Sequence, residues 1–327
     1  MANTIDVLGE KIAFEKVVDR SITEFEDDAL LEIGEYAFAY CLSLTSVSFP
    51  AVTSIRAAAF EGCGNLTNVY FPSTTIIANN AFSSCRNLTT VSFPAVISIN
   101  NNVFKNCSNL SIVSFPSATY IGNAAFSTTK LTNAYFPAAI YLEANAFANC
   151  YSLTTASFPL IKSIGGNAFG FCSSLTTLSF PVCISIGGSA FVNCRSLTTA
   201  SFPSCTDIGI SAFANCVNLT TTSFPSCTSI EQCAFSGCAN LTTTSFPSCT
   251  SIGSSAFQRC YNLVSLYLLG SSVAKLWHSN ALSSTPIAGY TTSTGGVYGS
   301  IYVPSSLLTT YQASTNWSFY SSRFVGV

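Results

Sequence analysis

The sequence predicts a solenoid, in which short coils of the chain stack on one another and share one continuous core. The main observation is a repeat: a Phe preceded by Ala or Val recurs along most of the 327 residues. Each step is 22 residues long, except that the step from Phe126 to Phe147 is 21. A fixed period of this size is typical of stacked units that each bury their apolar side against the next. The repeated residues are Phe38, Phe60, Phe82, Phe104, Phe126, Phe147, Phe169, Phe191, Phe213, Phe235 and Phe257.

The second observation is a strand signal in every coil. The best copies read Leu-Thr-Thr-x-Ser-Phe-Pro, then a short spacer, then Ser-Ile-Gly-x-x-Ala-Phe-x-x-Cys. Leu88–Phe93 ends in alternating apolar and polar residues before Pro94, which predicts a short half-buried strand. Because successive strands are one coil apart and run the same way, they should pair in parallel, about 4.8 Å apart. We expect about twelve coils, with strands that begin near Ile22, Leu44, Leu66, Leu88, Leu110, Leu131, Leu153, Leu175, Leu197, Leu219, Leu241 and Leu263.

The return path of each coil should form the opposite wall of the core. It carries an Ile, such as Ile99, and then the Ala-Phe pair, so two apolar layers close each coil. Stacked Phe rings are bulky while strands keep the sheet spacing, so we expect a curve that places the strands on the inner, concave side. The segment Phe126–Lys130 lacks one residue and the usual Cys, and should mark a local kink.

The ends of the repeat differ from its middle and predict caps. We place an N-terminal cap at residues 1–21, the solenoid at 22–268 and a C-terminal capping region at 269–327. Residues 1–35 hold ten acids and three bases, which would keep the exposed end of the stack polar and protect its strand edge. Beyond residue 268 the period breaks, Gly and Ser/Thr rise through 291–296, and aromatic residues gather towards the C-terminus. These aromatic residues should cover the last coil, although contact with a partner would fit them too.

Taken together, these residues resemble a known family. The pattern Leu-x-x-Val-x-Phe-Pro followed by Ile-Gly-x-x-Ala-Phe-x-x-Cys, over about residues 20–268, is similar to the BspA-like bacterial leucine-rich repeats. The resemblance implies a right-handed solenoid with a concave parallel β-sheet, found mostly in cell-surface and adhesion proteins that bind host proteins, matrix or other cells. It also implies a C-terminal cap, with residues 299–304 followed by a short helical stretch over 305–314.

Composition and charge disfavour several partners. Charged residues make up 8% of the chain, against a usual value of about 25%. Beyond residue 35 there are four acids and nine bases without a clustered basic stripe, so we expect no nucleic acid partner. We expect no membrane insertion, because no apolar run has the length of a span. The first residues also lack the pattern of a signal peptide. The resemblance implies a surface or extracellular location, while cytoplasmic or virion-associated locations stay open.

The fifteen cysteines form two columns. Ten lie three residues after a repeat Phe, four follow a repeat Pro by two, and Cys233 belongs to neither column. A zinc site needs Cys and His pairs that converge at short loop spacing, whereas this repeat supplies one thiol per coil. We therefore expect no metal and no cofactor. The thiols should be small buried groups that lend a weak donor to the turn, and disulfides along a column would be strained.

The outward residues of the strands are the main candidate for binding. Their third and fifth positions are mostly Thr and Ser, which stabilise a sheet through cross-strand contacts without any further function. Three tyrosines replace Ser in this column, and two of them follow an Asn. Exposed tyrosines among neutral donors suit binding of proteins or neutral sugars. The candidate binding residues on the concave face are Tyr70, Tyr135, Tyr267, Asn68 and Asn133.

We expect no enzymatic activity. The only histidine, His278, lies beyond the repeat and away from any Ser/Asp pair that the repeat would orient, so it should be a capping or surface residue. The acids of residues 24–28 could suggest a cation site, but they better suit the polar exposed end of a stack. No Gly-rich loop of the kind that holds phosphates is present.

The sequence therefore predicts a non-catalytic protein- or glycan-binding protein of the adhesion type, with recognition on the strand face. One alternative is a phage-encoded virion or tail-associated component, which would explain a surface-type repeat without a signal peptide. A third alternative, an enzyme, is disfavoured because no catalytic constellation is present.

Overall fold

The computed structural model describes residues 6–8, 11–14, 21–289 and 298–327. The chain divides into two compact units, one of residues 1–153 with 157–159 and one of 154–156 with 160–327. Most of the predicted N-terminal cap at 1–21, and the Gly- and Thr-rich run at 291–296, lie outside the described residues.

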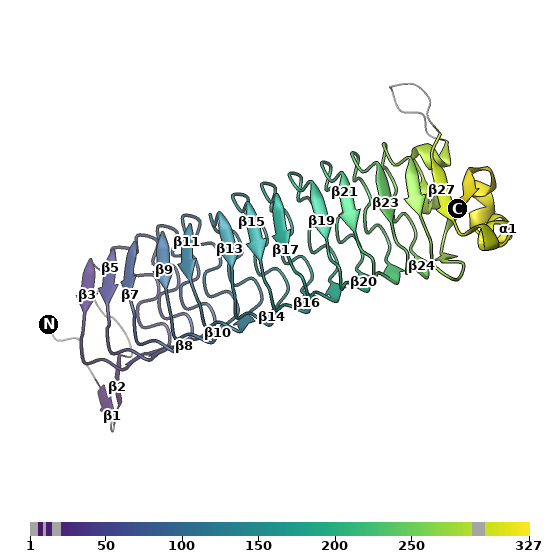
Figure 1. Cartoon of the computed structure of the whole chain (residues 1–327). Coiled ribbons are helices and arrows are strands. Elements are labelled where there is room, and N and C mark those ends of the chain that lie inside the picture. Colours follow the sequence, from purple (N-terminus) through teal and green to yellow (C-terminus); the bar gives the residue numbers. More distant parts are fainter. Residues whose placement is uncertain (1–5, 9–10, 15–20, 290–297) are drawn as a thin grey trace. The chain divides into compact units, whose positions relative to one another are not determined.

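Each coil contains a three-residue strand, a turn at the repeat Pro, a two-residue strand and a wide turn that carries the Ala-Phe pair (Figure 1). The three-residue strands of the first unit are β3 (Glu24–Glu26), β5 (Ser46–Ser48), β7 (Asn68–Tyr70), β9 (Thr90–Ser92), β11 (Ile112–Ser114) and β13 (Asn133–Tyr135). β15 (Thr155–Ser157) contains residues of both units. Those of the second unit are β17 (Thr177–Ser179), β19 (Thr199–Ser201), β21 (Thr221–Ser223), β23 (Thr243–Ser245) and β25 (Ser265–Tyr267).

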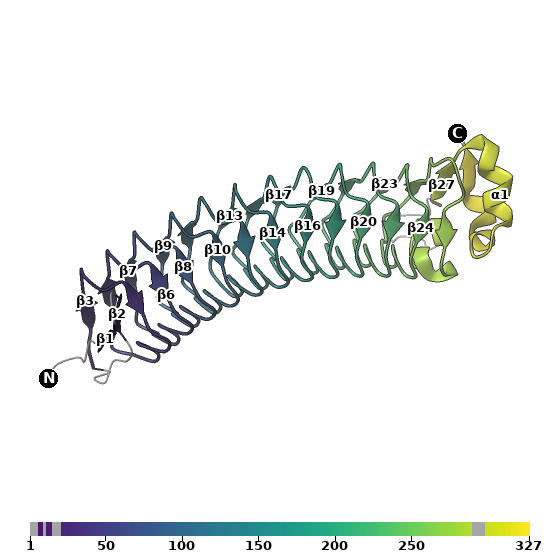
Figure 2. The same cartoon turned by 90° about the horizontal axis from the view of Figure 1, so that it is seen from below.

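The two-residue strands form a second wall, which sequence analysis described only as a return path. In the first unit they are β4 (Glu32–Ile33), β6 (Ser54–Ile55), β8 (Ile76–Ile77), β10 (Ser98–Ile99), β12 (Tyr120–Ile121) and β14 (Tyr141–Leu142). In the second unit they are β16 (Ser163–Ile164), β18 (Ser185–Ile186), β20 (Asp207–Ile208), β22 (Ser229–Ile230), β24 (Ser251–Ile252) and β26 (Lys275–Leu276). Within each unit they pair in unbroken parallel order, and Figure 2 shows them side by side.

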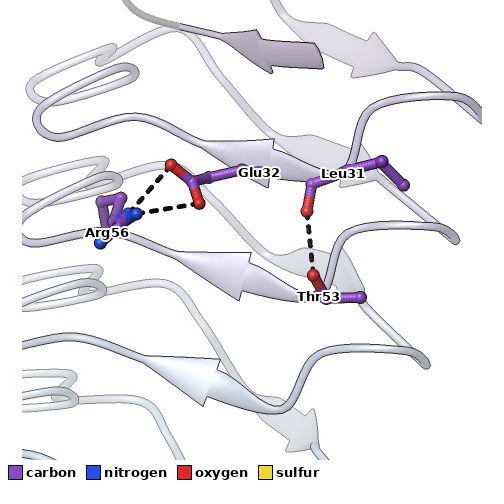
Figure 3. Close-up of polar contacts among 4 residues, drawn as sticks. All are labelled: Leu31, Glu32, Thr53 and Arg56. Atoms are coloured by element: carbon purple, nitrogen blue, oxygen red, sulfur yellow. Dashed lines mark hydrogen bonds and ion pairs between the residues drawn. The ribbon is translucent and has the colours of Figure 1, made fainter. Parts of the chain in front are cut away.

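The register between coils is the 22-residue period itself, which confirms the predicted parallel pairing. Phe25 lies opposite Val47, and Val47 opposite Val69. Side chains reinforce this register near the start of the first unit (Figure 3). The Thr53 hydroxyl donates to the Leu31 carbonyl at 3.3 Å, and the Arg56 guanidinium forms two bonds to Glu32, at 3.0 and 3.1 Å. The Leu31 carbonyl also accepts from the Thr53 backbone N–H, so the Thr53 side chain reinforces a backbone link between neighbouring coils.

The Ala-Phe wall carries a third ladder of backbone hydrogen bonds. Phe38 N–H donates to the Ala59 carbonyl at 2.7 Å, and Phe60 N–H donates to Ala81 at 2.8 Å. This geometry needs a left-handed residue two positions before and two positions after each Phe, as at Asn102 (φ 57°) and Asn106 (φ 60°). Asn adopts this region more readily than most residues, which explains its frequency in these turns.

Two columns of stacked Phe rings fill the core. In the first unit the Ala-Phe rings are 5.0–5.6 Å apart, and the rings that precede Pro are 5.5–6.4 Å apart. The second unit shows the same order, 5.2–5.4 Å against 5.6–6.0 Å. The expected curvature assumed that the Ala-Phe rings need the wider spacing. That premise is wrong, because the wider spacing lies behind the three-residue strands.

The cysteine column after the repeat Phe links neighbouring coils. The Cys63 thiol donates to the Phe38 carbonyl at 2.9 Å, and the Cys85 thiol donates to Phe60 at 3.1 Å. In the shortened coil Thr129 takes this place, donates to the Phe126 carbonyl at 2.9 Å and lies 3.2 Å from the sulfur of Cys150. All fifteen cysteines are free thiols. The predicted structural column of thiol donors is therefore confirmed.

The ends of the chain add further strands and helices. β1 (Asp6–Leu8) and β2 (Lys11–Phe14) pair antiparallel, and β2 joins β4 in parallel. The C-terminal segments are η1 (Ser279–Leu282), η2 (Pro286–Ala288), β27 (Ser300–Val303), η3 (Ser305–Leu307), α1 (Leu308–Ala313), η4 (Trp317–Arg323) and β28 (Phe324–Gly326). None of the helices in the described residues is long and apolar enough to cross a membrane.

The C-terminal segments close the open edge of the last coil. Trp317 Nε1 donates to the Ala274 carbonyl at 2.7 Å, and Asn316 Nδ2 donates to the Leu276 carbonyl at 2.8 Å. Ala274 N–H donates in turn to the Tyr311 hydroxyl at 3.0 Å. Tyr311 and Trp317 are buried, whereas Phe319 stays exposed. Side-chain bonds thus satisfy the edge groups of β26, where another strand could otherwise pair.

The thiol column predicts sensitivity to alkali. Burial raises the pKa of Cys107 to about 12, whereas an unfolded cysteine titrates at about 8.5. Above about pH 8.5 the unfolded state binds fewer protons than the folded state does. Each such thiol therefore lowers the free energy of unfolding by up to about 1.4 kcal/mol per pH unit. Urea unfolding should show a falling midpoint between about pH 9 and 11. Cys107→Thr, which copies Thr129, should lose less stability over this range, and equal losses would contradict a role for the buried thiol.

Candidate functional site

The outward residues of the three-residue strands form the strand face. In the first unit Tyr70 and Tyr135 are 57% and 59% exposed. Asn68 and Asn133 precede them by two residues on the same strands and are also exposed. Alternation along a strand explains this placement, because the residue between each Asn and Tyr points into the core. The predicted exposure of these four residues is confirmed.

The ladder of this face is interrupted on both sides of the pair β9–β11. β7 ends the sheet β3–β5–β7, and β13 belongs to another sheet. Thr67 N–H donates to Thr45 at 2.9 Å and Ser111 N–H donates to Thr89 at 3.0 Å, but the described backbone bonds include none from Thr89 N–H to Thr67.

The core rings show the same two openings. The rings of Phe71 and Phe93 are 6.0 Å apart, and those of Phe115 and Phe136 are 6.4 Å apart. At the intact pair between them, the rings of Phe93 and Phe115 are 5.7 Å apart. In the first unit, the two interrupted steps are thus those at which the rings behind the strands are farthest apart.

A shallow hollow lies beside each opening. The hollow between β7 and β9 has a volume of about 370 Å³, and that between β11 and β13 about 440 Å³. The first is lined by Thr67, Asn68, Val69, Tyr70, Phe71, Pro72, Thr89, Thr90, Ser92 and Pro94. The second is lined by Ser111, Ile112, Val113, Ser114, Phe115, Pro116, Thr132, Asn133, Tyr135 and Pro137. Neither lining contains a charged side chain.

The two hollows and the strands between them form one surface, which we call the tyrosine cradle. Its floor is the pair β9–β11, and its two walls are the tyrosines of β7 and β13. Three strand steps separate the walls, which therefore lie more than about 14 Å apart, because two of the three steps exceed the spacing of a sheet. The residues of the cradle are Asn68, Tyr70, Thr90, Ser92, Ile112, Ser114, Asn133 and Tyr135.

The shortened coil accounts for the wider of the two openings. In a regular coil Asn109 N–H donates to the Arg86 carbonyl at 3.1 Å, but in the shortened coil Lys130 N–H donates to Leu110 at 3.0 Å. The Ala-Phe wall continues unchanged there, since Phe126 N–H donates to Ala146 at 2.8 Å. The deletion after Thr129 therefore acts on the strand side.

Interruptions also occur in the second unit, but without tyrosines beside them. The ladder is interrupted between β17 and β19 and between β21 and β23. The outward residues at those strands are Thr and Ser only. The interruptions therefore arise from the spacing of the core, and only in the first unit do they coincide with large aromatic side chains.

The third predicted tyrosine lies in a different environment. Tyr267 belongs to the second unit, where its ring stacks on Tyr302 with centroids 4.4 Å apart and planes 10° apart. β25 pairs there with β27 of the C-terminal region, which leaves Tyr267 only partly exposed. Its contacts indicate a packing role at the end of the repeat.

One residue of the cradle was not among the predicted binding residues. Ile112 stands in the outward column where half of the coils have Thr, and it is 61% exposed. An apolar residue in this column was the available signal. It gives the floor of the cradle an apolar centre between the two tyrosines.

The other candidate functional side chains form local hydrogen bonds that stabilise the fold. His278 Nδ1 accepts from Asn280 N–H at 3.1 Å at the start of η1, so the predicted capping role is confirmed. Asp27 accepts from the backbone of Ala29 and Leu30 at 2.9 and 3.0 Å. Within the described ranges, no three His, Cys, Asp or Glu side chains are grouped so that they could hold a metal ion.

The comparisons with known proteins agree with this architecture. The model of one family, the BspA type leucine rich repeat region (6 copies), matches residues 31–154 and again residues 140–264. The chain therefore belongs to this family, and the predicted leucine-rich-repeat solenoid is confirmed. No curated protein matches the sequence.

Among solved structures, the chain is similar to a leucine-rich repeat protein from Bacteroides ovatus ATCC 8483. The identity is 25%, the match covers 79% of this chain and 84% of that one, and the TM-score is 0.57. A leucine rich cell surface protein from Faecalibacterium prausnitzii A2-165 is 27% identical over 80% of this chain and 76% of that one, with a TM-score of 0.49.

The environments of the three tyrosines predict different costs of truncation. Tyr267→Ala removes a stacked, partly buried ring and should cost about 2 kcal/mol of stability. Tyr70→Ala and Tyr135→Ala remove exposed rings and should change stability by less than about 0.5 kcal/mol. Chemical unfolding of the three variants measures this difference. Equal losses in all three would mean that the cradle tyrosines hold the fold together.

Proposed function

We propose that this chain is a non-catalytic binding protein of the adhesion type, which recognises an uncharged protein or glycan surface through its strand face. The observation that carries the proposal is the tyrosine cradle: two exposed tyrosines flank two hollows that no charged side chain lines. Tyr combines a large apolar face with a polar hydroxyl and loses little conformational entropy on contact, which suits a recognition surface.

Family membership supports a binding scaffold. Repeat proteins present extended surfaces formed by equivalent positions of successive coils, and these positions can vary without disturbing the core. Tyr70, Ile112 and Tyr135 occupy such positions, which Thr and Ser fill in most other coils. A non-catalytic role is further supported by His278, whose ring nitrogen is engaged in a helix cap.

The proposal predicts that the cradle tyrosines decide binding to an array of purified extracellular proteins and glycans. Wild-type protein should bind at least one member, and the double variant Tyr70→Ala/Tyr135→Ala should lose most of that signal. Tyr141→Ala is the matched control, because Tyr141 is 61% exposed but lies on β14, in the other wall. If the double variant binds as strongly as the control, recognition does not use the cradle.

A further inference from the structure

We propose that the tyrosine cradle binds a neutral, linear oligosaccharide that lies across strands β7 to β13, with sugar rings packed against Tyr70 and Tyr135. This inference rests on the proposed function and narrows it to one class of ligand. It concerns residues 67–137, which lie in the first unit.

The walls of the cradle suit the flat faces of sugar rings. A pyranose ring presents C–H groups on its faces and hydroxyl groups around its rim. A tyrosine ring supplies an apolar face for the former and a hydroxyl for the latter. Tyr70 and Tyr135 each lie beside a hollow of 370–440 Å³, within the usual size range of small-ligand sites, about 300–1,000 Å³.

The floor offers hydroxyl groups that the fold does not use. The hydroxyls in the column just before the strands are used by the fold: those of Thr67 and Ser111 donate to carbonyls of the preceding coil at 3.0 and 3.4 Å. The hydrogen bonds of the described residues include none from the hydroxyls of Thr90, Ser92 or Ser114. Each hydroxyl can both donate and accept, as each sugar hydroxyl can, so the two sets are complementary.

The spacing of the walls favours a ligand with a repeating unit. Asn68-Val69-Tyr70 and Asn133-Ala134-Tyr135 place the same pair of outward groups at both ends of the cradle. The two pairs are three strand steps apart, which is more than about 14 Å. A linear oligosaccharide presents equivalent rings along its length, so one chain can place a ring at each end.

The absence of charge among the lining residues of both hollows selects neutral sugars. An acidic polysaccharide would gain no salt bridge there, and its carboxylates would lose water without a charged partner. We therefore expect neutral hexose or pentose chains to bind and uronic-acid chains of the same length to bind more weakly.

Calorimetric titration with defined probes tests the inference. The probes are the hexasaccharides of α-1,4-glucose, β-1,3-glucose, β-1,4-glucose, β-1,4-xylose and β-1,4-mannose, the matching disaccharides, and a hyaluronan hexasaccharide. At least one neutral hexasaccharide should bind, and Tyr70→Ala or Tyr135→Ala should each weaken its binding about tenfold. The matching disaccharide should bind more weakly, because it cannot reach both walls. Tyr141→Ala should bind as the wild type does.

Other outcomes overturn the inference in distinguishable ways. If no neutral hexasaccharide binds, or if the cradle variants bind as tightly as Tyr141→Ala, the glycan assignment is wrong. If in addition the array shows a protein partner that survives enzymatic deglycosylation and needs Tyr70 and Tyr135, the cradle is a protein site and the proposed function stands. If the cradle variants bind every member of the array as the wild type does, the proposed function fails as well.

Discussion

The hydrogen bonds between successive coils are the constraint on which the rest of this structure depends. Each coil meets its neighbour on three walls, and all three must keep one register of 22 residues. The Ala-Phe wall and the two-residue strands keep their ladders within each unit. The three-residue strands do not: in the first unit their ladder is interrupted where the Phe rings behind them are farthest apart, at 6.0 and 6.4 Å. The strand face is therefore the wall on which the stack opens.

The openings give the strand face its local chemistry. Most outward residues of the face are Thr and Ser, and the Thr residues just before the strands, such as Thr45 and Thr67, donate to the preceding coil. Where it is interrupted in the first unit, hollows form, and Tyr70 and Tyr135 stand at their rims. A one-residue deletion after Thr129 widens one opening without disturbing the opposite wall. Recognition can thus be adjusted on one wall while the other two preserve the fold.

Periodicity made most of the fold predictable, because every coil repeats the same buried residues. The exposure of Tyr70 and Tyr135 followed from their column in the repeat. The stacking of Tyr267 did not, since its partner Tyr302 comes from the aperiodic C-terminal region. The hollows were also beyond prediction, because they depend on differences of a few tenths of an ångström between stacked rings. Ile112 could have been found as the apolar exception in a Thr column.

Residue-resolved hydrogen exchange of the backbone amides tests the central claim most directly. Thr67, Thr89 and Ser111 hold the same position in three successive coils, but among the described backbone bonds only the first and last donate to the coil before them, at 2.9 and 3.0 Å. We expect the Thr89 amide to exchange at least about a hundredfold faster than those of Thr67 and Ser111. Equal protection of all three amides would show that the ladder is continuous, and would contradict the claim that the tyrosine cradle arises where the ladder opens.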